Sequence, residues 1–191
     1  MEFGALTGGG WAAGLNLWSA VLVLGIAGRM DWAATPEVLH RTDILVAAAV
    51  LYALEFVVDK IPYVDNAWDV ASTIIRPVGG TLLGIAVAAE GGGSLLAGAV
   101  TAGGLALTSH TAKATTRAAI NMSPEPFSNI AASLTEDAAA VGIVSLGLAY
   151  PVLTVGVVGI LAIAAVLVTF SLWRFVRRLR RRWRTGLPTT A

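Results

Sequence analysis

Ionisable side chains recur in this chain at intervals of three or four residues, the spacing that places side chains on one face of a helix. Glu55 and Asp59 are four residues apart, and so are Asp65 and Asp69. On α-helices such pairs form one polar stripe. An ionisable group within an apolar helix is costly unless it is paired or hydrated, so these residues are candidates for function.

Further stripes extend this pattern. Arg76 continues the face of Asp65 and Asp69, and two later segments carry residues at i, i+3 or i+4, and i+7. The predicted binding residues are Glu55, Asp59, Lys60, Asp65, Asp69, Arg76, His110, Lys113, Arg117, Asn129, Ser133, Glu136 and Asp137. Their acids outnumber their fixed bases, which leaves enough negative charge for a bound cation or for protons held on carboxyl groups.

Two kinds of chemistry fit these residue types. In the first, Glu55, Glu136 and Asp137 bind a coupling proton or cation, and basic residues hold these acids or receive an anionic group. In the second, Mg²⁺ is held by carboxylate oxygens, its preferred ligands. The metal candidates are Asp65, Asp69, Glu136 and Asp137, with Lys113 and Arg117 gripping a phosphate and His110 as acid or base. No P-loop, nucleophile elbow or complete phosphotransferase motif accompanies them.

A purely structural interpretation is the alternative for several of these residues. Asp59 to Asp69 could be interfacial groups wetted by lipid headgroups, and the stripe from His110 to Arg117 could be a helix end that snorkels to lipid phosphates. Arg76 fits this interpretation less well. It precedes Pro77, which frees a backbone carbonyl one turn earlier, and an arginine there needs an acidic partner.

The composition indicates where these stripes must lie. The 191 residues are 56% hydrophobic and 13% charged, whereas soluble domains carry about 25% charged residues. This excludes disorder and most water-soluble folds, and it argues against nucleic-acid binding as the main role. The absence of cysteine excludes disulfides, thiolate metal sites and cysteine nucleophiles. We therefore predict an all-α integral membrane protein.

Six membrane spans are predicted from the gaps between charges, at about 20 residues per span. The uncharged run from Ala138 to Trp173 is too long for one span and is divided at Pro151. The predicted spans are Trp11 to Gly28, about Ile44 to Asp59, Asp65 to Glu90, Leu95 to His110 or as far as Ile120, Ile130 to Tyr150, and Val152 to Trp173.

An arginine-rich tail follows the last span, so we divide the chain into a membrane domain, 1–173, and a tail, 174–191. Seven arginines lie between Arg174 and Arg184, and without them the body has six basic and twelve acidic residues. Such a tail is expected on the cytoplasmic side, bound to anionic lipid headgroups. Six spans then place the N-terminus on the cytoplasmic side as well.

The lipid phase cannot solvate four charged stripes, so they are expected to converge in a polar chamber between spans two to five, toward the cytoplasmic half. A weak repeat at an offset of 64 residues, Pro62-Tyr63-Asp65 with Pro126-Phe127-Asn129, suggests that spans 2–3 and 4–5 are related hairpins flanked by spans 1 and 6. The G-x-x-x-G pairs Gly10–Gly14 and Gly80–Gly84 predict close helix packing and are compatible with a homo-oligomer.

Two charged runs carry a resemblance to a known family. The first is Glu55, Asp59-Lys60-Ile61-Pro62, Asp65, Trp68-Asp69, Arg76-Pro77, and the second runs from His110 through Lys113 and Arg117 to Glu136-Asp137. Between about Leu15 and Pro151 the chain resembles a bacterial integral-membrane family, domain of unknown function 4126. The resemblance implies a small protein of the bacterial inner membrane and supplies no activity.

Three functions remain open at this point. The leading hypothesis is a small transporter or channel-like protein for an ion or a small polar or anionic solute. One form of this hypothesis couples transport to a proton or a cation. The alternatives are a Mg²⁺-dependent enzyme acting on a lipid phosphate headgroup and a non-catalytic membrane scaffold.

Overall fold

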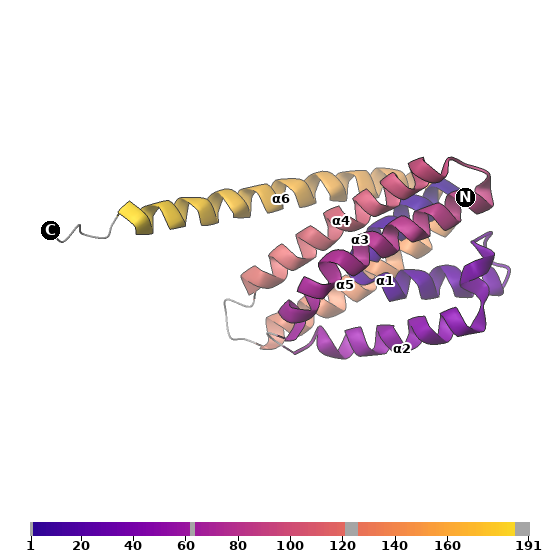
Figure 1. The fold of residues 1–191 in the computed structure, drawn as a ribbon, viewed down its shortest axis with the longest axis horizontal. Helices are drawn as coiled ribbons and strands as arrows, with labels where there is room; N and C mark the ends of the chain where they lie inside the picture. The colour runs from indigo at the N-terminus through magenta and orange to yellow at the C-terminus, as the bar shows by residue number, and fades with distance from the viewer. Residues whose placement is uncertain (1, 62–63, 121–125, 186–191) are drawn as a thin grey trace.

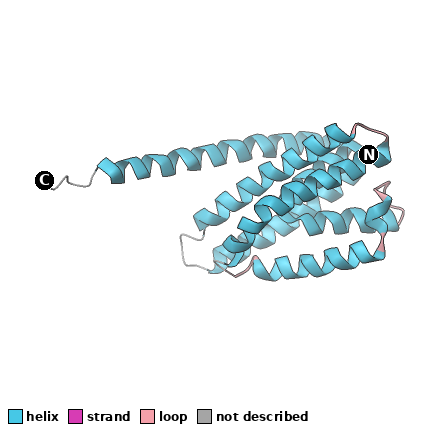
Figure 2. Cartoon of the chain, in the orientation of Figure 1, coloured by secondary structure: helices cyan, strands magenta, loops and turns pink. Residues whose placement is uncertain are grey.

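The computed structural model describes residues 2–61, 64–120 and 126–185, and within them every regular element is a helix (Figure 2). The helices are α1 (Glu2–Arg29), the short 3₁₀ helix η1 (Glu37–His40), α2 (Thr42–Val58), α3 (Val64–Gly91), α4 (Leu95–Ile120), α5 (Pro126–Ala149) and α6 (Pro151–Thr185). The predicted all-α fold is confirmed. Four of the described helices (α1, α3, α5 and α6) are long and apolar enough to cross a membrane.

The first helix is broken at Asn16, whose backbone is extended (φ −155°, ψ 103°). The two halves, 2–15 and 17–29, fold back on each other. A Cβ at Gly9 would lie 3.3 Å from Leu24 Cδ1, whereas 15 residues of continuous helix span about 22 Å. One small pocket of about 100 Å³ is lined both by Glu2 and by Thr35, from either side of α1. The helix therefore enters the bundle and returns to the same end.

This geometry corrects the predicted first span. The apolar run Trp11 to Gly28 is not one continuous span, because Asn16 reverses the chain within it. Six spans were expected to place both termini on one side, whereas α2 to α6 run alternately along the bundle. The start of α1 and the end of α6 lie at opposite ends (Figure 1).

The re-entrant α1 occupies the middle of the bundle, where most of its residues are buried. It packs on α3, α4 and α5, and α3 packs along α4. The expected arrangement of two hairpins flanked by the first and last spans is therefore wrong in one respect, because α1 is central. The packing of α2 on α3 is slight, and the internal repeat stays a prediction.

Glycine permits the close helix contacts at the centre. A Cβ at Gly14 would collide with the Ser109 side chain and the Ala106 carbonyl of α4, and one at Gly84 would collide with the Gly98 carbonyl. The two G-x-x-x-G pairs thus serve packing within the chain, as close helix approach in a membrane requires.

The two remaining helices are peripheral. In α2 the buried residues are Ala48 and Glu55, so a charged side chain is a main attachment of this helix to the bundle. At the other edge, α6 follows the bundle for its first half and then diverges from α4 (Figure 1). Its helix continues through the first part of the arginine tail.

Candidate functional site

The buried charged residues of α2 to α5 meet at the end of the bundle where α2 ends and α3 begins. Together with Asn16 from α1 they form what we call the charged cluster: Asn16, Glu55, Asp59, Lys60, Asp65, Asp69, Arg76, His110, Lys113, Arg117, Asn129, Ser133, Glu136 and Asp137. Most are buried, with Arg117, Asn129 and Ser133 fully inaccessible. Each cation of the cluster joins several helices.

Arg76 of α3 is enclosed at one side of the cluster and is 1% exposed. Its Nη2 donates to Glu55 Oε1 of α2 at 2.5 Å, and its Nη1 lies 3.6 Å from Asp69 Oδ1. The same Nη1 donates to the Gly14 carbonyl at 3.1 Å and to His110 Nδ1 at 3.0 Å. One guanidinium thereby links α1, α2, α3 and α4.

The contact with Arg76 determines which nitrogen of His110 carries the proton. A guanidinium can only donate, so His110 Nδ1 must be the acceptor. A neutral ring then carries its proton on Nε2, which lies 3.1 Å from Thr73 Oγ1. The Thr73 hydroxyl in turn donates to the Asp69 carbonyl at 2.8 Å. His110 is thereby held as the neutral Nε2–H tautomer.

Lys113 of α4 occupies the middle of the cluster. Its ammonium lies 2.5 Å from Oδ2 of Asp59, the residue that follows α2, and 3.6 Å from Oε2 of Glu136 on α5. It also donates to the Leu15 carbonyl at 3.1 Å. The side chain is 1% exposed. An ammonium at this depth requires such oxygen partners, because burial of an unpaired charge is strongly unfavourable.

Arg117, one turn further along α4, holds the start of α5. Its Nε and Nη2 donate to Glu136 Oε2 at 3.1 and 2.7 Å, and its Nη1 donates to Asn129 Oδ1 at 2.5 Å. It also donates to the Asp59 carbonyl at 3.1 Å and lies 3.5 Å from Asp65 Oδ2. Through these contacts Arg117 joins Asp59 and Glu136, which lie 77 positions apart in the sequence.

Lys60 and Asp137 form the more accessible side of the cluster. Lys60 Nζ lies 3.7 Å from Asp137 Oδ2. The same ammonium donates to Ser133 Oγ at 3.3 Å and lies over the Phe56 ring. Burial lowers the pKa of the Lys60 ammonium, and the charge of Asp137 opposes this effect. Asp137 Oδ1 accepts a hydrogen bond of 3.1 Å from the Asn16 amide.

Asn16 is a site residue that the charge-based analysis missed. Its Oδ1 accepts from the Ser19 N–H at 3.0 Å, which caps the second half of α1. The break leaves the Gly14 and Leu15 carbonyls free, and these accept from Arg76 and Lys113. The carbonyl end of a half-helix carries partial negative charge and favours cations. A polar residue within the uncharged run 3–28 was the available signal.

The structure thus brings together all thirteen predicted binding residues, and it adds α1 to the four helices expected around them. The interpretation of His110, Lys113 and Arg117 as a snorkelling helix end does not fit, because all three are at most 4% exposed. The buried Asp59, Asp65 and Asp69 are likewise not arranged as headgroup-wetted side chains.

The carboxylates are distributed among the bases. Within the described ranges, no three His, Asp or Glu side chains are grouped so that they could hold a metal ion. The four metal candidates have different neighbours: Asp65 and Glu136 face Arg117, Asp69 faces Arg76, and Asp137 faces Lys60 and Asn16. The geometry thus offers no support for the Mg²⁺ hypothesis.

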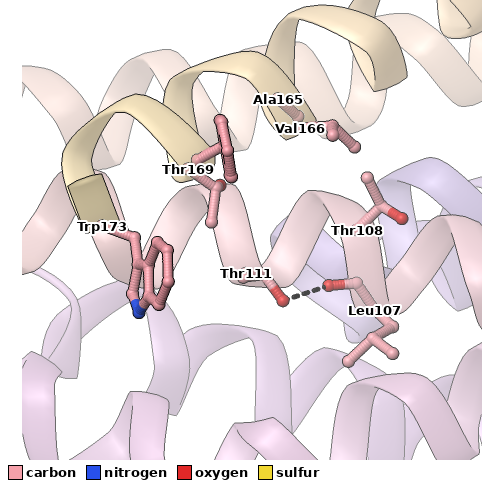
Figure 3. Close-up of a pocket in the computed structure, with 8 residues that line it drawn as sticks. Leu107, Thr108, Thr111, Ala165, Val166, Thr169 and Trp173 are labelled. Atoms are coloured by element: carbon pink, nitrogen blue, oxygen red, sulfur yellow. Dashed lines mark hydrogen bonds between the residues drawn. The ribbon is translucent and has the colours of Figure 1, made fainter.

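A separate groove of about 370 Å³ lies between α4 and α6 (Figure 3). It is lined by Leu107, Thr108, Thr111, Ala165, Val166, Thr169, Phe170 and Trp173. The Thr111 hydroxyl donates to the Leu107 carbonyl of its own helix at 2.7 Å, so its hydrogen is used within α4. The groove is consequently mostly apolar.

The groove ends at the arginines of α6. Phe170 and Trp173 also line an adjoining pocket of about 410 Å³ with Arg174, Arg177 and Arg178. The guanidinium carbons of Arg174 and Arg177 lie 5.2 and 5.1 Å from the Phe170 and Trp173 ring centres. These distances are those of cation–π pairs.

The sequence matches the model of a protein family. The family model described as a domain of unknown function (DUF4126) matches residues 4–171. No curated protein and no solved structure matches this chain. The match covers α1 to most of α6, and with them every residue of the charged cluster.

Proposed function

Because the chain belongs to the family of domain of unknown function 4126, whose description names no activity, we propose a function from the charged cluster itself: a small membrane transporter or channel-like protein for an ion or a small polar solute. The observation that carries this proposal is the tip of the re-entrant α1. Broken helices whose free backbone ends meet charged groups are a recurrent construction of ion and solute sites in transporters.

The charge balance supports transport over a purely structural role. Six acids face four fixed bases in the cluster, and His110 is held neutral, so the protein leaves a negative surplus at this site. A scaffold would be better stabilised by apolar packing, since a buried ion pair often contributes no more than hydrophobic residues of the same volume. Buried carboxylates in excess of the bases can bind and release a cation or a proton.

Glu136 offers the sharpest test, since it contacts both Arg117 and Lys113 and is the more exposed acid of the central pairs, at 15%. Purified protein in liposomes is assayed for flux of H⁺, Na⁺, K⁺, chloride and phosphate under an imposed gradient. We expect flux of at least one ion, reduced at least tenfold in Glu136→Gln. Glu90→Gln, at the exposed end of α3, is the matched control.

Two results would reject the transport proposal. One is the absence of flux for every ion tested, with protein that elutes as a folded species. The other is a flux that Glu136→Gln leaves at the wild-type level. The scaffold hypothesis predicts the first result, together with loss of stability in variants of the cluster.

We also propose that the protein resides in a bacterial inner membrane with the arginine tail on the cytoplasmic side. Both ends of the re-entrant α1 then face the opposite side. The tail then contacts the anionic leaflet, as juxtamembrane basic segments do. The arginines at the end of the α4–α6 groove support this, because their charge and the apolar groove match a phospholipid headgroup and its acyl chain.

A further inference from the structure

Asp69 differs from the other acids of the charged cluster. Glu55, Asp59 and Glu136 each have an oxygen within 2.7 Å of a cationic nitrogen. Asp69 is 5% exposed, and among the described residues neither of its carboxylate oxygens has a hydrogen-bond partner. Its closest ion-pair contact is Arg76 Nη1, at 3.6 Å, which is too long for a hydrogen bond.

Arg76 and Thr73, on the same helix as Asp69, direct their hydrogen bonds to other acceptors. Arg76 donates to Glu55, His110 and the Gly14 carbonyl. The Thr73 hydroxyl donates to the backbone carbonyl of Asp69, so its proton is unavailable to the carboxylate. Neither residue donates a hydrogen bond to the Asp69 carboxylate.

The neighbouring helices do not compensate either. From α4, Lys113 is the cation that acts on Asp69, and it is shared with Asp59 and the Leu15 carbonyl, while His110 is held neutral. From α2 and α5, Asp59 and Glu136 bring further negative charge.

We propose that Asp69 is the proton-binding residue of the charged cluster, which makes the proton the ion coupled to transport. A buried carboxylate that accepts no hydrogen bond is far less stable than the neutral acid, so uptake of one proton by an Asp69 oxygen removes the least compensated charge. No other bond changes. The coupling of this proton to transport rests on the proposed function, whereas proton binding by Asp69 does not.

Infrared difference spectroscopy tests the binding step directly. The protein in phosphatidylcholine liposomes is titrated with pH, and the carbonyl stretch of a protonated carboxyl group is followed. We expect a band that disappears as the pH rises and that is absent in Asp69→Asn, which keeps the side-chain shape. Asp43→Asn, an exposed acid that pairs with Arg41 outside the cluster, is expected to retain the band.

The same liposomes, loaded with a pH-sensitive dye, separate this inference from the proposed function. Proton flux that Asp69→Asn abolishes supports both. A titrating band without any flux supports proton binding by Asp69 and counts against transport. A band that persists in Asp69→Asn, or one that responds to Na⁺ at constant pH, overturns the assignment of the proton to Asp69.

Discussion

Arg76 illustrates what the charged residues do individually, because its guanidinium contacts α1, α2 and α4 from a position on α3. Glu55 is one of the buried residues of α2, so this pair attaches a peripheral helix to the bundle. The pair need not add net stability compared with apolar residues, but removal of one partner leaves the other charge buried and unpaired.

We therefore predict that Arg76→Gln lowers the free energy of unfolding by about 3–5 kcal/mol. Thermal unfolding in detergent micelles measures the change. Arg41→Gln breaks the exposed pair with Asp43 and is expected to leave the unfolding midpoint unchanged. A double variant, Glu55→Gln with Arg76→Gln, should recover part of the loss. Equal midpoints for Arg76→Gln and Arg41→Gln would contradict the role assigned to Arg76.

The spacing of charges was sufficient to predict which residues form the cluster, since acids and bases in apolar helices must find partners. It was insufficient for the partners themselves. Lys113 contacts Asp59 and Leu15, and those contacts depend on how α1, α2 and α4 are shifted along one another. Asn16 was missed because an uncharged amide does not interrupt an apolar run.

At the scale of elements, α1 shows why hydropathy alone misleads. The run from residue 3 to 28 is long and apolar enough to cross a membrane, and these properties are the same for one straight helix and for two antiparallel halves. Whether α1 continues straight or turns back depends on a single extended residue, Asn16. It also depends on small residues such as Gly9 and Gly14, which permit close packing.

The last helix leads to a prediction about lipid. Its 35 residues span about 52 Å, more than the ~30 Å hydrocarbon layer, so its arginines reach the headgroups. Phosphatidylglycerol should raise the melting temperature more than phosphatidylcholine does, and the combined Arg174→Gln, Arg177→Gln and Arg178→Gln variant should lose that difference. Each arginine contributes about 1 kcal/mol at an anionic surface.

The control for the lipid measurement is Arg29→Gln, at the end of α1 far from the tail. High salt should reduce the preference of the wild type for phosphatidylglycerol, because exposed charges are screened. An unchanged preference in the triple variant would show that the tail arginines do not bind the anionic headgroup.

At the scale of the whole molecule, the fold predicts that the start of α1 and the segment after it face the same side. The chain has no cysteine, so single cysteines report without background. Phe3→Cys and Trp32→Cys, both at exposed positions, should react with a membrane-impermeant maleimide from one side, and Val176→Cys from the other. Labelling of Phe3→Cys and Trp32→Cys from opposite sides would show that α1 crosses the membrane.

The re-entrant α1 also constrains how the protein is made. Its half-helices are each about 14 residues long by the position of the break, shorter than the ~20 residues that a spanning helix needs. The surfaces that enclose them belong to α3, α4 and α5, which are synthesised later. The amino-terminal segment must therefore be kept at the insertion machinery, or at the bilayer surface, until the rest of the bundle emerges from the ribosome and receives it.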